Sequence, residues 1–286
     1  MASSMSTENP QLSINLVCFN EKDLLRNALR YIKKAQISIP YEVVVLDNSS
    51  QDQDEVMDMV SVEYPEAIRL AEKTNTGFTQ AVNTCARHSK GTYLFNMNPD
   101  VVVLPGQLEQ MVAFLKERPN VGMMGPKLLN FDGTVQGSAF QFTTPQIALY
   151  RRTPLGRSAF AKRRIQEFLL QDGWDWNSER KVDWVLGAAV MYRRSVAEEL
   201  GHLDENLFLY FSDTDFAWRL WENGYMVVYY PEAMLYHYYQ KSSGGTLSLS
   251  SLFNFAFRKH LQDGVTFFRK HLGDPNPRLQ KMAALK

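Results

Sequence analysis

The chain has no excess of charge of either sign, because its 286 residues include 31 Lys and Arg and 31 Asp and Glu. A balanced charge supplies no global field that would attract nucleic acid or an acidic partner. We therefore expect no nucleic-acid binding, and any electrostatic preference has to be local.

Cysteines and long apolar runs are scarce as well. Cys18 and Cys85 are too few for a disulfide framework, and we expect both to be small core residues of a protein in a reducing cytosol. No apolar run approaches the length that spans a bilayer, and the opening MASSMSTENP lacks the hydrophobic stretch of a secretion signal. These absences predict a cytoplasmic protein, and a hydrophobic content of 45% is enough for a large core.

The first half of the chain alternates between strand-like and helix-like segments. Buried strands that alternate with helices predict an α/β fold, with a mostly parallel sheet flanked by helices on both faces. The predicted strands are 12–18, 41–47, 67–72 and 92–97, and the predicted helices are 21–35, 52–62, 77–89 and 105–119.

The second half is less regular. The segment VGMMGPKLLNFDGTVQ predicts a strand that enters a hairpin at Asp132 and Gly133. Residues 137–181 predict no regular element, whereas residues 182–194 predict one buried strand that leads into YFSDTDFAWRL.

Short polar segments follow the predicted strands. In α/β sheets, ligands bind beyond the carboxyl ends of the strands, so these segments predict a polar pocket, although each alone is an ordinary turn. A glycine-rich dinucleotide or P-loop motif is missing after the first strand, which argues against both of those folds. The segments are FNE (19–21), DNSS (47–50), KTNTGF (73–78) and NPD (98–100).

These segments, together with VLGAAVMYRR, YFSDTDFAWRL and YHYYQKSS, resemble a family 2 inverting glycosyltransferase over residues 12–270. The NPD triplet, the DW pair at 183–184 and the aromatic run before Asp213 are most similar to bacterial rhamnosyltransferases. The resemblance implies a GT-A (Rossmann-like) fold with a C-terminal helical extension. It divides the chain into a disordered segment 1–11, a catalytic domain 12–250 with a nucleotide-sugar half (12–136) and an acceptor half (137–250), and an amphipathic helix and tail 251–286.

The resemblance also implies a donor site for a dTDP- or UDP-sugar. Asp47 matches the residue whose carboxylate accepts a hydrogen bond from the ring N3–H of uracil or thymine. Asn20, Asn75 and Gly77 are expected to frame the nucleotide, and helix capping or turn formation is an alternative role for each of these three residues taken singly. The implied donor-binding residues are Phe19, Asn20, Asp47, Asn48, Asn75, Gly77, Asn98 and Gly187.

The NPD segment resembles the metal motif of the family. Asn98 replaces its first acid, so Asp100 is the candidate ligand for Mg²⁺ or Mn²⁺ on the donor diphosphate. His237 resembles a family histidine that joins the metal, although a packed aromatic cluster with its neighbouring tyrosines is an alternative.

Asp213 matches the general base of the family, which takes the proton of the acceptor hydroxyl while the sugar is displaced with inversion. The residue before this aspartate is usually acidic, whereas this chain has Ser212. Ser212 and Asp215 form an S-x-x-D capping pattern, and Asp215 and Arg219 have the spacing of a surface ion pair. We expect Trp184, Asp215 and Arg219 to support the acceptor or the helix start.

The implied function is transfer of a sugar, by first choice L-rhamnose from dTDP-rhamnose, to a glycan or polyprenyl-diphosphate-linked acceptor in bacterial surface polysaccharide synthesis. Another dTDP- or UDP-sugar is an alternative donor, and a non-catalytic sugar-binding module is an alternative class. A nucleotidyltransferase is disfavoured, because FNEKD stands where a glycine-rich basic loop is needed.

The basic run 151–164 carries six basic side chains and no acid, and the stretch 252–270 predicts a basic amphipathic helix. We expect peripheral contact with the inner face of the cell membrane. Packing of the helix on the sheet or on a second subunit of a homodimer is the alternative. The predicted apolar face contains Phe253, Phe257, Leu261, Val265 and Phe268.

Overall fold

The computed structural model describes residues 9–238 and 254–284. Most of the predicted disordered segment 1–11, the residues that end YHYYQKSS and Phe253 lie outside the described residues.

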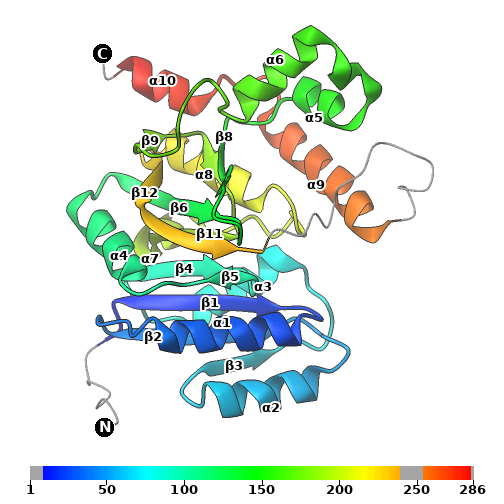
Figure 1. Cartoon of the computed structure of the whole chain (residues 1–286). Helices are drawn as coiled ribbons and strands as arrows, with labels where there is room; N and C mark the ends of the chain where they lie inside the picture. Colours follow the sequence, from blue (N-terminus) through cyan, green and yellow to red (C-terminus); the bar gives the residue numbers. More distant parts are fainter. Residues whose placement is uncertain (1–8, 239–253, 285–286) are drawn as a thin grey trace.

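One large sheet forms the centre of the molecule, and helices cover both of its faces (Figure 1). Its principal strand order is β3-β2-β1-β4-β11-β6-β12-β5, with β7 beside β6 and β9 beside β12. The neighbours among β1 to β4 pair in parallel, while β11 runs antiparallel to both β4 and β6. The strands are β1 (Leu12–Cys18), β2 (Tyr41–Asp47), β3 (Ile68–Ala71), β4 (Tyr93–Met97), β5 (Val101–Val102), β6 (Val121–Leu129), β7 (Val135–Gln136), β8 (Ala139–Phe140), β9 (Arg180–Lys181), β10 (Trp184–Val185), β11 (Ala189–Arg193) and β12 (Met226–His237).

The helices confirm the predicted alternation, and each begins and ends within a few residues of its predicted bounds in the first half of the chain. Strand β2 places apolar side chains on both faces of the sheet, as a strand buried between two layers of helices requires. Strand β1 is apolar on one face, and on the other it carries the buried polar residues Ser13 and Asn15, of which Asn15 donates a hydrogen bond to Asn96 at 3.1 Å. The helices are α1 (Lys22–Lys34), α2 (Gln53–Glu63), α3 (Phe78–His88), α4 (Gln107–Glu117), α5 (Pro145–Arg152), η1 (Pro154–Arg157), α6 (Ala159–Phe168), α7 (Arg194–Leu200), α8 (Ser212–Glu222), α9 (Phe255–His271) and α10 (Pro277–Ala284).

Cys18 and Cys85 are fully buried in this core, as predicted. Burial raises the pKa of each thiol to about 12, so neither is a nucleophile near neutral pH. The hairpin at Asp132 and Gly133 is also confirmed, because β7 pairs antiparallel with β6 after this turn.

Two predictions for the second half were wrong. Residues 137–181 are not irregular throughout, since they contain α5, η1 and α6. The side chains of Thr144 and Ser158 cap the starts of α5 and α6, respectively. Residues 182–194 do not form one strand, because the chain breaks after β10 and β11 belongs to a different sheet. The break places Gly187 in a loop between the two strands.

The C-terminal extension consists of two helices, α9 and α10, which lie with α5 and α6 on one side of the sheet (Figure 1). The predicted apolar side chains of α9 are divided between the interior and the surface. Phe257 is buried, but Leu261 and Val265 are 40% and 51% exposed. The buried face instead contains Phe257, Asp263, Gly264, Phe267 and His271.

None of the helices in residues 9–238 and 254–284 combines the length and the apolar content needed to cross a membrane.

Candidate active site

Polar side chains from two neighbouring loops meet beyond the ends of β2 and β3. Asn48 donates a hydrogen bond to the side-chain oxygen of Asn75 at 3.1 Å and accepts one from the amide of Thr76 at 3.0 Å. The Asn75 oxygen also accepts a hydrogen bond from the amide of Gly77 at 2.9 Å. The structure thus brings three of the predicted donor residues into one network.

Gly77 occupies a position that only glycine fits. Its φ is +88°, and a Cβ atom there would lie 2.6 Å from the carbonyl oxygen of Phe208. The NTG segment therefore lies directly against the loop that precedes α8.

Asp47 ends β2 in a fully buried position. Its carboxylate accepts hydrogen bonds from the amide and the hydroxyl of Ser50 at 2.8 and 2.6 Å, and from Gln53 at 2.8 Å. The Ser50 hydroxyl in turn accepts a hydrogen bond from the amide of Asn20, which has a positive φ of 58°. In this structure Asp47 orders the loop, whereas Phe19 is exposed beside it.

Asp100 and His237 come together at the antiparallel pairing of β5 with β12. The distance from His237 Nε2 to Asp100 Oδ1 is 3.3 Å, and Gln136 contacts the Nδ1 atom of His237 at 2.6 Å. Asp100 Oδ1 is buried and has no hydrogen bond within the described part of the chain. A buried carboxylate oxygen beside an imidazole fits two ligands of a divalent ion.

No cluster of three or more His, Cys, Asp or Glu side chains suited to a metal occurs among the described residues. Two protein ligands nevertheless suffice for an ion that keeps water and phosphate oxygens as its remaining ligands. Asp100 and His237 therefore fit a metal that binds together with a diphosphate.

Glu21 lies in the FNE segment after β1, and its sequence context predicted no role for it. Desolvation raises the pKa of its carboxyl group, and the neighbouring negative charge of Asp100 raises that pKa further. Two carboxylates that repel each other favour a cation between them or beside them. Glu21 becomes a candidate site residue only because the fold places it near Asp100, which is far from it in the sequence.

The NPD turn is joined to the glycine loop, because the amide of Asn98 donates a hydrogen bond to the carbonyl of Ala188 at 2.8 Å. Gly187, the residue before Ala188, donates a hydrogen bond from its amide to Asp213 Oδ2 at 2.9 Å. A Cβ atom on Gly187 would lie 3.1 Å from that same oxygen. Glycine therefore lets the loop approach the carboxylate closely, and Asn98, Gly187 and Asp213 lie along one connected path.

Asp213 lies in the first turn of α8. Burial raises the pKa of its carboxyl group, although the amides of Gly187 and Thr214 act in the opposite direction. A small hollow of about 20 Å³ beside it is lined in part by Phe78, Asn96 and Tyr192. A carboxylate with a raised pKa at the edge of a hollow is suited to accept a proton.

The capping prediction for Ser212 and Asp215 was wrong. The residue before the helix is Phe211, and Asp215 points into the protein, where it is 0% exposed. The predicted pair with Arg219 is present at 2.8 Å, but it is buried rather than on the surface. Hydrophobic packing of the aromatic side chains of α8 turns this face of the helix inward.

Asp215 has two further partners from α9, a histidine and a lysine, which its sequence spacing did not predict. His271 Nε2 and Lys270 Nζ lie 2.9 and 2.8 Å from Asp215 Oδ1. Burial alone would raise the pKa of Asp215, but the hydrogen bond from His271 and the charges of Arg219 and Lys270 lower it to about 2. Asp215 is thus an ionised structural anchor.

Among the described residues, no hydrogen bond connects Trp184 with Asp213. Its indole donates to the carbonyl of Gln141 at 2.8 Å and its ring stacks on Phe140. The adjacent Asp183 accepts hydrogen bonds from the amide of Phe142 and from Asn276, so Asp183 joins the C-terminal extension to the segment that contains β8.

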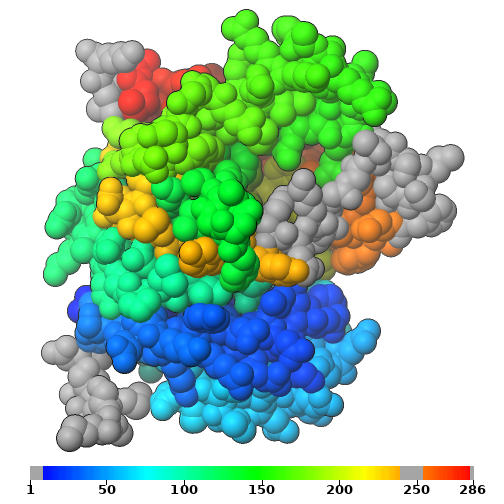
Figure 2. All heavy atoms as spheres, in the orientation of Figure 1, coloured from blue at the N-terminus to red at the C-terminus, as the bar shows by residue number. Residues whose placement is uncertain are grey.

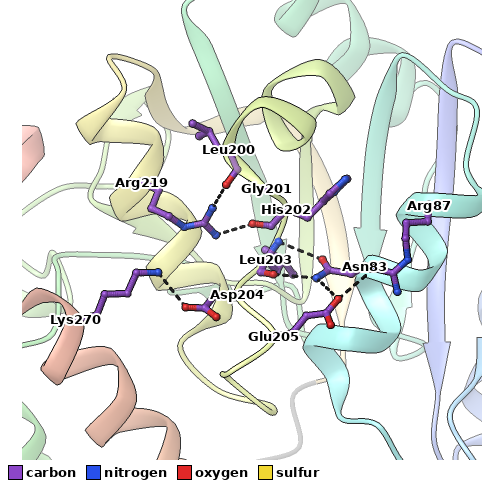
Figure 3. Close-up of a pocket in the computed structure, with 10 residues that line it drawn as sticks. All are labelled: Asn83, Arg87, Leu200, Gly201, His202, Leu203, Asp204, Glu205, Arg219 and Lys270. Carbon is purple, nitrogen blue, oxygen red and sulfur yellow. Dashed lines mark hydrogen bonds and ion pairs between the residues drawn. The ribbon is translucent and has the colours of Figure 1, made fainter.

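A cavity of about 350 Å³ lies between α3, the turn after α7, α8 and α9 (Figure 3). Its polar side chains point toward one another, and they are already paired: Arg87 with Glu205, and Lys270 with Asp204. Arg219 donates to the carbonyls of Leu200 and His202. Of the predicted site residues, this cavity contains only Arg219.

Comparison with known proteins identifies similar sequences over most of the chain. The family described as glycosyltransferase like family 2 matches residues 10–259. The N-acetylglucosaminyl-diphospho-decaprenol L-rhamnosyltransferase of Mycobacterium tuberculosis is 28% identical over 226 residues, which are 72% of this chain and 69% of that protein. The O-antigen biosynthesis protein RfbC of Myxococcus xanthus is 28% identical over 80% of this chain, but the match covers only 17% of RfbC.

Solved structures share the fold. A mannosyltransferase from Pyrobaculum calidifontis, in complex with GDP-Man and Mn²⁺, superposes with a TM-score of 0.61 at 19% identity and covers 98% of this chain and 70% of its own. GalNAc-T7 with UDP, GalNAc and Mn²⁺ gives a TM-score of 0.59 at 16% identity, over 81% of this chain and 44% of its own. The predicted GT-A fold is thereby confirmed.

Proposed function

The chain belongs to glycosyltransferase family 2, and from that premise we propose that it transfers L-rhamnose from dTDP-rhamnose, with inversion, to an acceptor hydroxyl. The acceptor would be a glycan or a polyprenyl-diphosphate-linked sugar of a bacterial surface polysaccharide. The observation that carries the proposal is the contact of Asp213 with Gly187, since it aims a carboxylate of raised pKa at the loop joined to the NPD turn.

In the proposed reaction, Asp213 accepts the proton of the acceptor hydroxyl. The hydroxyl oxygen forms a bond to the anomeric carbon while the bond from that carbon to the diphosphate oxygen breaks. The electron pair of the broken bond leaves with the nucleoside diphosphate. A single displacement from the opposite face inverts the anomeric configuration.

A divalent ion, Mg²⁺ or Mn²⁺, would stabilise the negative charge on the leaving diphosphate when it is bound. Asp100 and His237 are the residues proposed to hold it, because the buried Asp100 Oδ1 faces the imidazole and has no hydrogen bond among the described residues. The likeness to two solved enzymes crystallised with Mn²⁺ supports a metal of this class.

On the donor side, the Asn48, Asn75 and Gly77 network is proposed to frame the nucleotide, with Asn20 and Phe19 at the rim. Asp47 is proposed to accept a further hydrogen bond from the pyrimidine, because its carboxylate has about four acceptor sites and Ser50 and Gln53 occupy three of them. The choice of rhamnose rests on the Mycobacterium tuberculosis relative, whose name states that sugar.

A screen of nucleotide sugars tests the proposal. The protein is incubated with dTDP-rhamnose, and with UDP- and GDP-sugars, in Mg²⁺ or Mn²⁺, and nucleoside diphosphate release is measured with and without polyprenyl-diphosphate-linked N-acetylglucosamine. We expect the wild-type protein to release dTDP from dTDP-rhamnose, and to release it faster when the acceptor is present. The Asp213→Asn variant should release none. Turnover of a different sugar would correct the donor. Binding without turnover of any sugar would favour the sugar-binding module.

We also propose peripheral attachment to anionic membrane through the α5–α6 hairpin and the outer face of α9. The hairpin lies at the upper edge of the molecule in Figure 2, and Leu155 and Phe160 on it are 58% and 66% exposed. The only acid of α9, Asp263, is buried, whereas Arg258 and Arg269 are exposed. Exposed apolar side chains and an excess of basic ones fit an anionic lipid surface. Glu167, which pairs with Arg163 and Arg164, is the one acid of the hairpin.

A further inference from the structure

Residues 208–211 lead directly into α8, the helix that carries Asp213. The amides of these four residues donate no backbone–backbone hydrogen bond among those of the described turns and loops. The final residue of the segment, Phe211, has a φ of 65°, which is a costly conformation for an aromatic residue. No side chain caps the start of α8. Something outside the segment must therefore hold it.

The carboxylate of Asp263, in the middle of α9, supplies this restraint. It is 2% exposed and accepts hydrogen bonds from three consecutive backbone amides, those of Phe208 at 3.0 Å, Leu209 at 2.9 Å and Tyr210 at 2.8 Å. Hydrogen bonds to an ionised acceptor are stronger than neutral ones, and a buried carboxylate requires such partners.

Neighbouring residues of α9 hold the remaining residue of the segment. The ring of Phe211 stacks on Phe267 with a centroid distance of 5.2 Å. Gly264 lies beside the same ring, since a Cβ atom on it would be 3.4 Å from the Phe211 side chain, at van der Waals distance. Asp263, Gly264 and Phe267 thus contact the whole segment from one helix face.

The other side of the segment contacts the donor network. The carbonyl of Phe208 accepts a hydrogen bond from the amide of Thr79 at 3.3 Å and lies against Gly77. The segment is therefore fixed between α9 and the NTG loop, two to five residues before Asp213.

We propose that Asp263 is a positioning residue: it fixes residues 208–211 between the donor loop and α9 and thereby orients Asp213. This inference deepens the proposed function and rests on it, because Asp263 acts on the reaction only through the base. Its side chain is enclosed and contacts no reacting group.

The test compares Asp263→Asn and Asp263→Ala with Asp274→Asn, which removes an exposed acid just after the same helix. The asparagine retains one oxygen that can accept, whereas alanine retains none. We expect amide hydrogen exchange in a peptide covering 206–212 to accelerate at least tenfold in the asparagine variant and further in the alanine variant. Asp274→Asn should match wild type.

Nucleoside diphosphate release from the active nucleotide sugar is measured on the same proteins. We expect kcat to fall about tenfold in Asp263→Asn and about a hundredfold in Asp263→Ala, with the donor KM within twofold of wild type. A purely structural role would instead lower the amount of folded enzyme and leave the kcat per folded molecule unchanged.

Faster exchange with an unchanged kcat would overturn the positioning role, as would unaltered exchange. If Asp263→Ala fails to fold, the asparagine variant decides between these outcomes. If the wild-type protein turns over no nucleotide sugar, the proposed function and the effect of Asp263 on kcat are both overturned. In that case, faster exchange in the Asp263 variants than in wild type would still show that Asp263 holds residues 208–211.

Discussion

Asp213 Oδ2 accepts a hydrogen bond from the amide of Gly187 at 2.9 Å, across 26 residues of sequence. This contact joins the start of α8 to the loop between β10 and β11. It fixes the direction of one carboxylate oxygen and leaves the Asp213 side chain partly accessible.

Replacement of Asp213 by asparagine is expected to abolish transfer and to leave donor affinity nearly unchanged. The change removes the proton acceptor while it keeps the shape of the side chain and leaves the nucleotide loops intact. Steady-state kinetics and calorimetric titration of the donor measure the two effects. Near-normal turnover by Asp213→Asn would contradict the assignment of the base.

The acidic side of the kcat profile should reflect the raised pKa of Asp213. The base acts when it is ionised, so kcat should fall as the pH drops through that pKa, at a midpoint above the ordinary aspartate value of about 4. Glu21→Gln is the control, because Glu21 also has a raised pKa. A midpoint that moves in Glu21→Gln would assign the titration to Glu21 instead.

A methyl group on Gly187 is expected to lower kcat by about 10- to 100-fold, since its Cβ atom would lie 3.1 Å from Asp213 Oδ2 and push the carboxylate aside. Gly137→Ala is the matched control, because the nearest atoms to its Cβ are 3.7 and 3.8 Å away. If Gly187→Ala and Gly137→Ala had equal kcat values and equal melting temperatures, the position of Asp213 Oδ2 would not affect the rate of transfer.

Removal of the Asp100 carboxylate in Asp100→Ala should weaken the binding of dTDP or UDP in the presence of Mn²⁺, and should have little effect without the metal. Calorimetry with and without Mn²⁺ separates these cases. Asp132→Ala, which alters an exposed acid of the neighbouring hairpin, should bind as wild type does. Metal-dependent binding that survives in Asp100→Ala would place the ion elsewhere.

Asp215→Asn should destabilise the fold by about 3 kcal/mol, because it leaves Arg219 and Lys270 without their buried partner. The folded pKa of about 2 lies below the unfolded value, so the contribution of Asp215 is complete above pH about 4 and is lost as the pH falls toward 2. Denaturant unfolding at several pH values measures this difference.

Asp172→Asn provides the comparison for Asp215→Asn, since it breaks an exposed pair with Arg180 and should cost less than about 1 kcal/mol. A constant difference between wild type and Asp215→Asn from pH 5 to pH 2 would contradict the ionised role of Asp215.

Anionic liposomes should bind the protein at low salt and release it as salt rises. Arg163 and Arg164 are exposed on α6 and contact only Glu167 among the ion pairs of the described residues, so their replacement by glutamate should weaken the binding. Co-sedimentation that is indifferent to lipid charge would favour a soluble acceptor, and a concentration-dependent dimer in solution would favour a second subunit as the partner of α9.

The sequence by itself determined the alternation of strands and helices in the first half of the chain and the loops that carry the family motifs. Both depend on local patterns: the period of the apolar residues and the polar residues that directly follow each strand. The strands β1 and β2 coincide with their predicted bounds for this reason. The break at Gly187 did not follow from such a pattern, because the residues around it are apolar on both sides.

Only the tertiary structure decided how Asp215 and α9 are used. Local spacing predicted that Asp215 caps a helix on the surface, but His271, 56 residues later, pairs with it in the interior. Asp263 reaches the amide of Phe208 across 55 residues, and nothing near either residue in the sequence marks the contact. Such pairs form because the buried face of α9 packs beside α8, where Phe267 and His271 contact Trp218. Packing between distant elements depends on the whole fold rather than on any one segment.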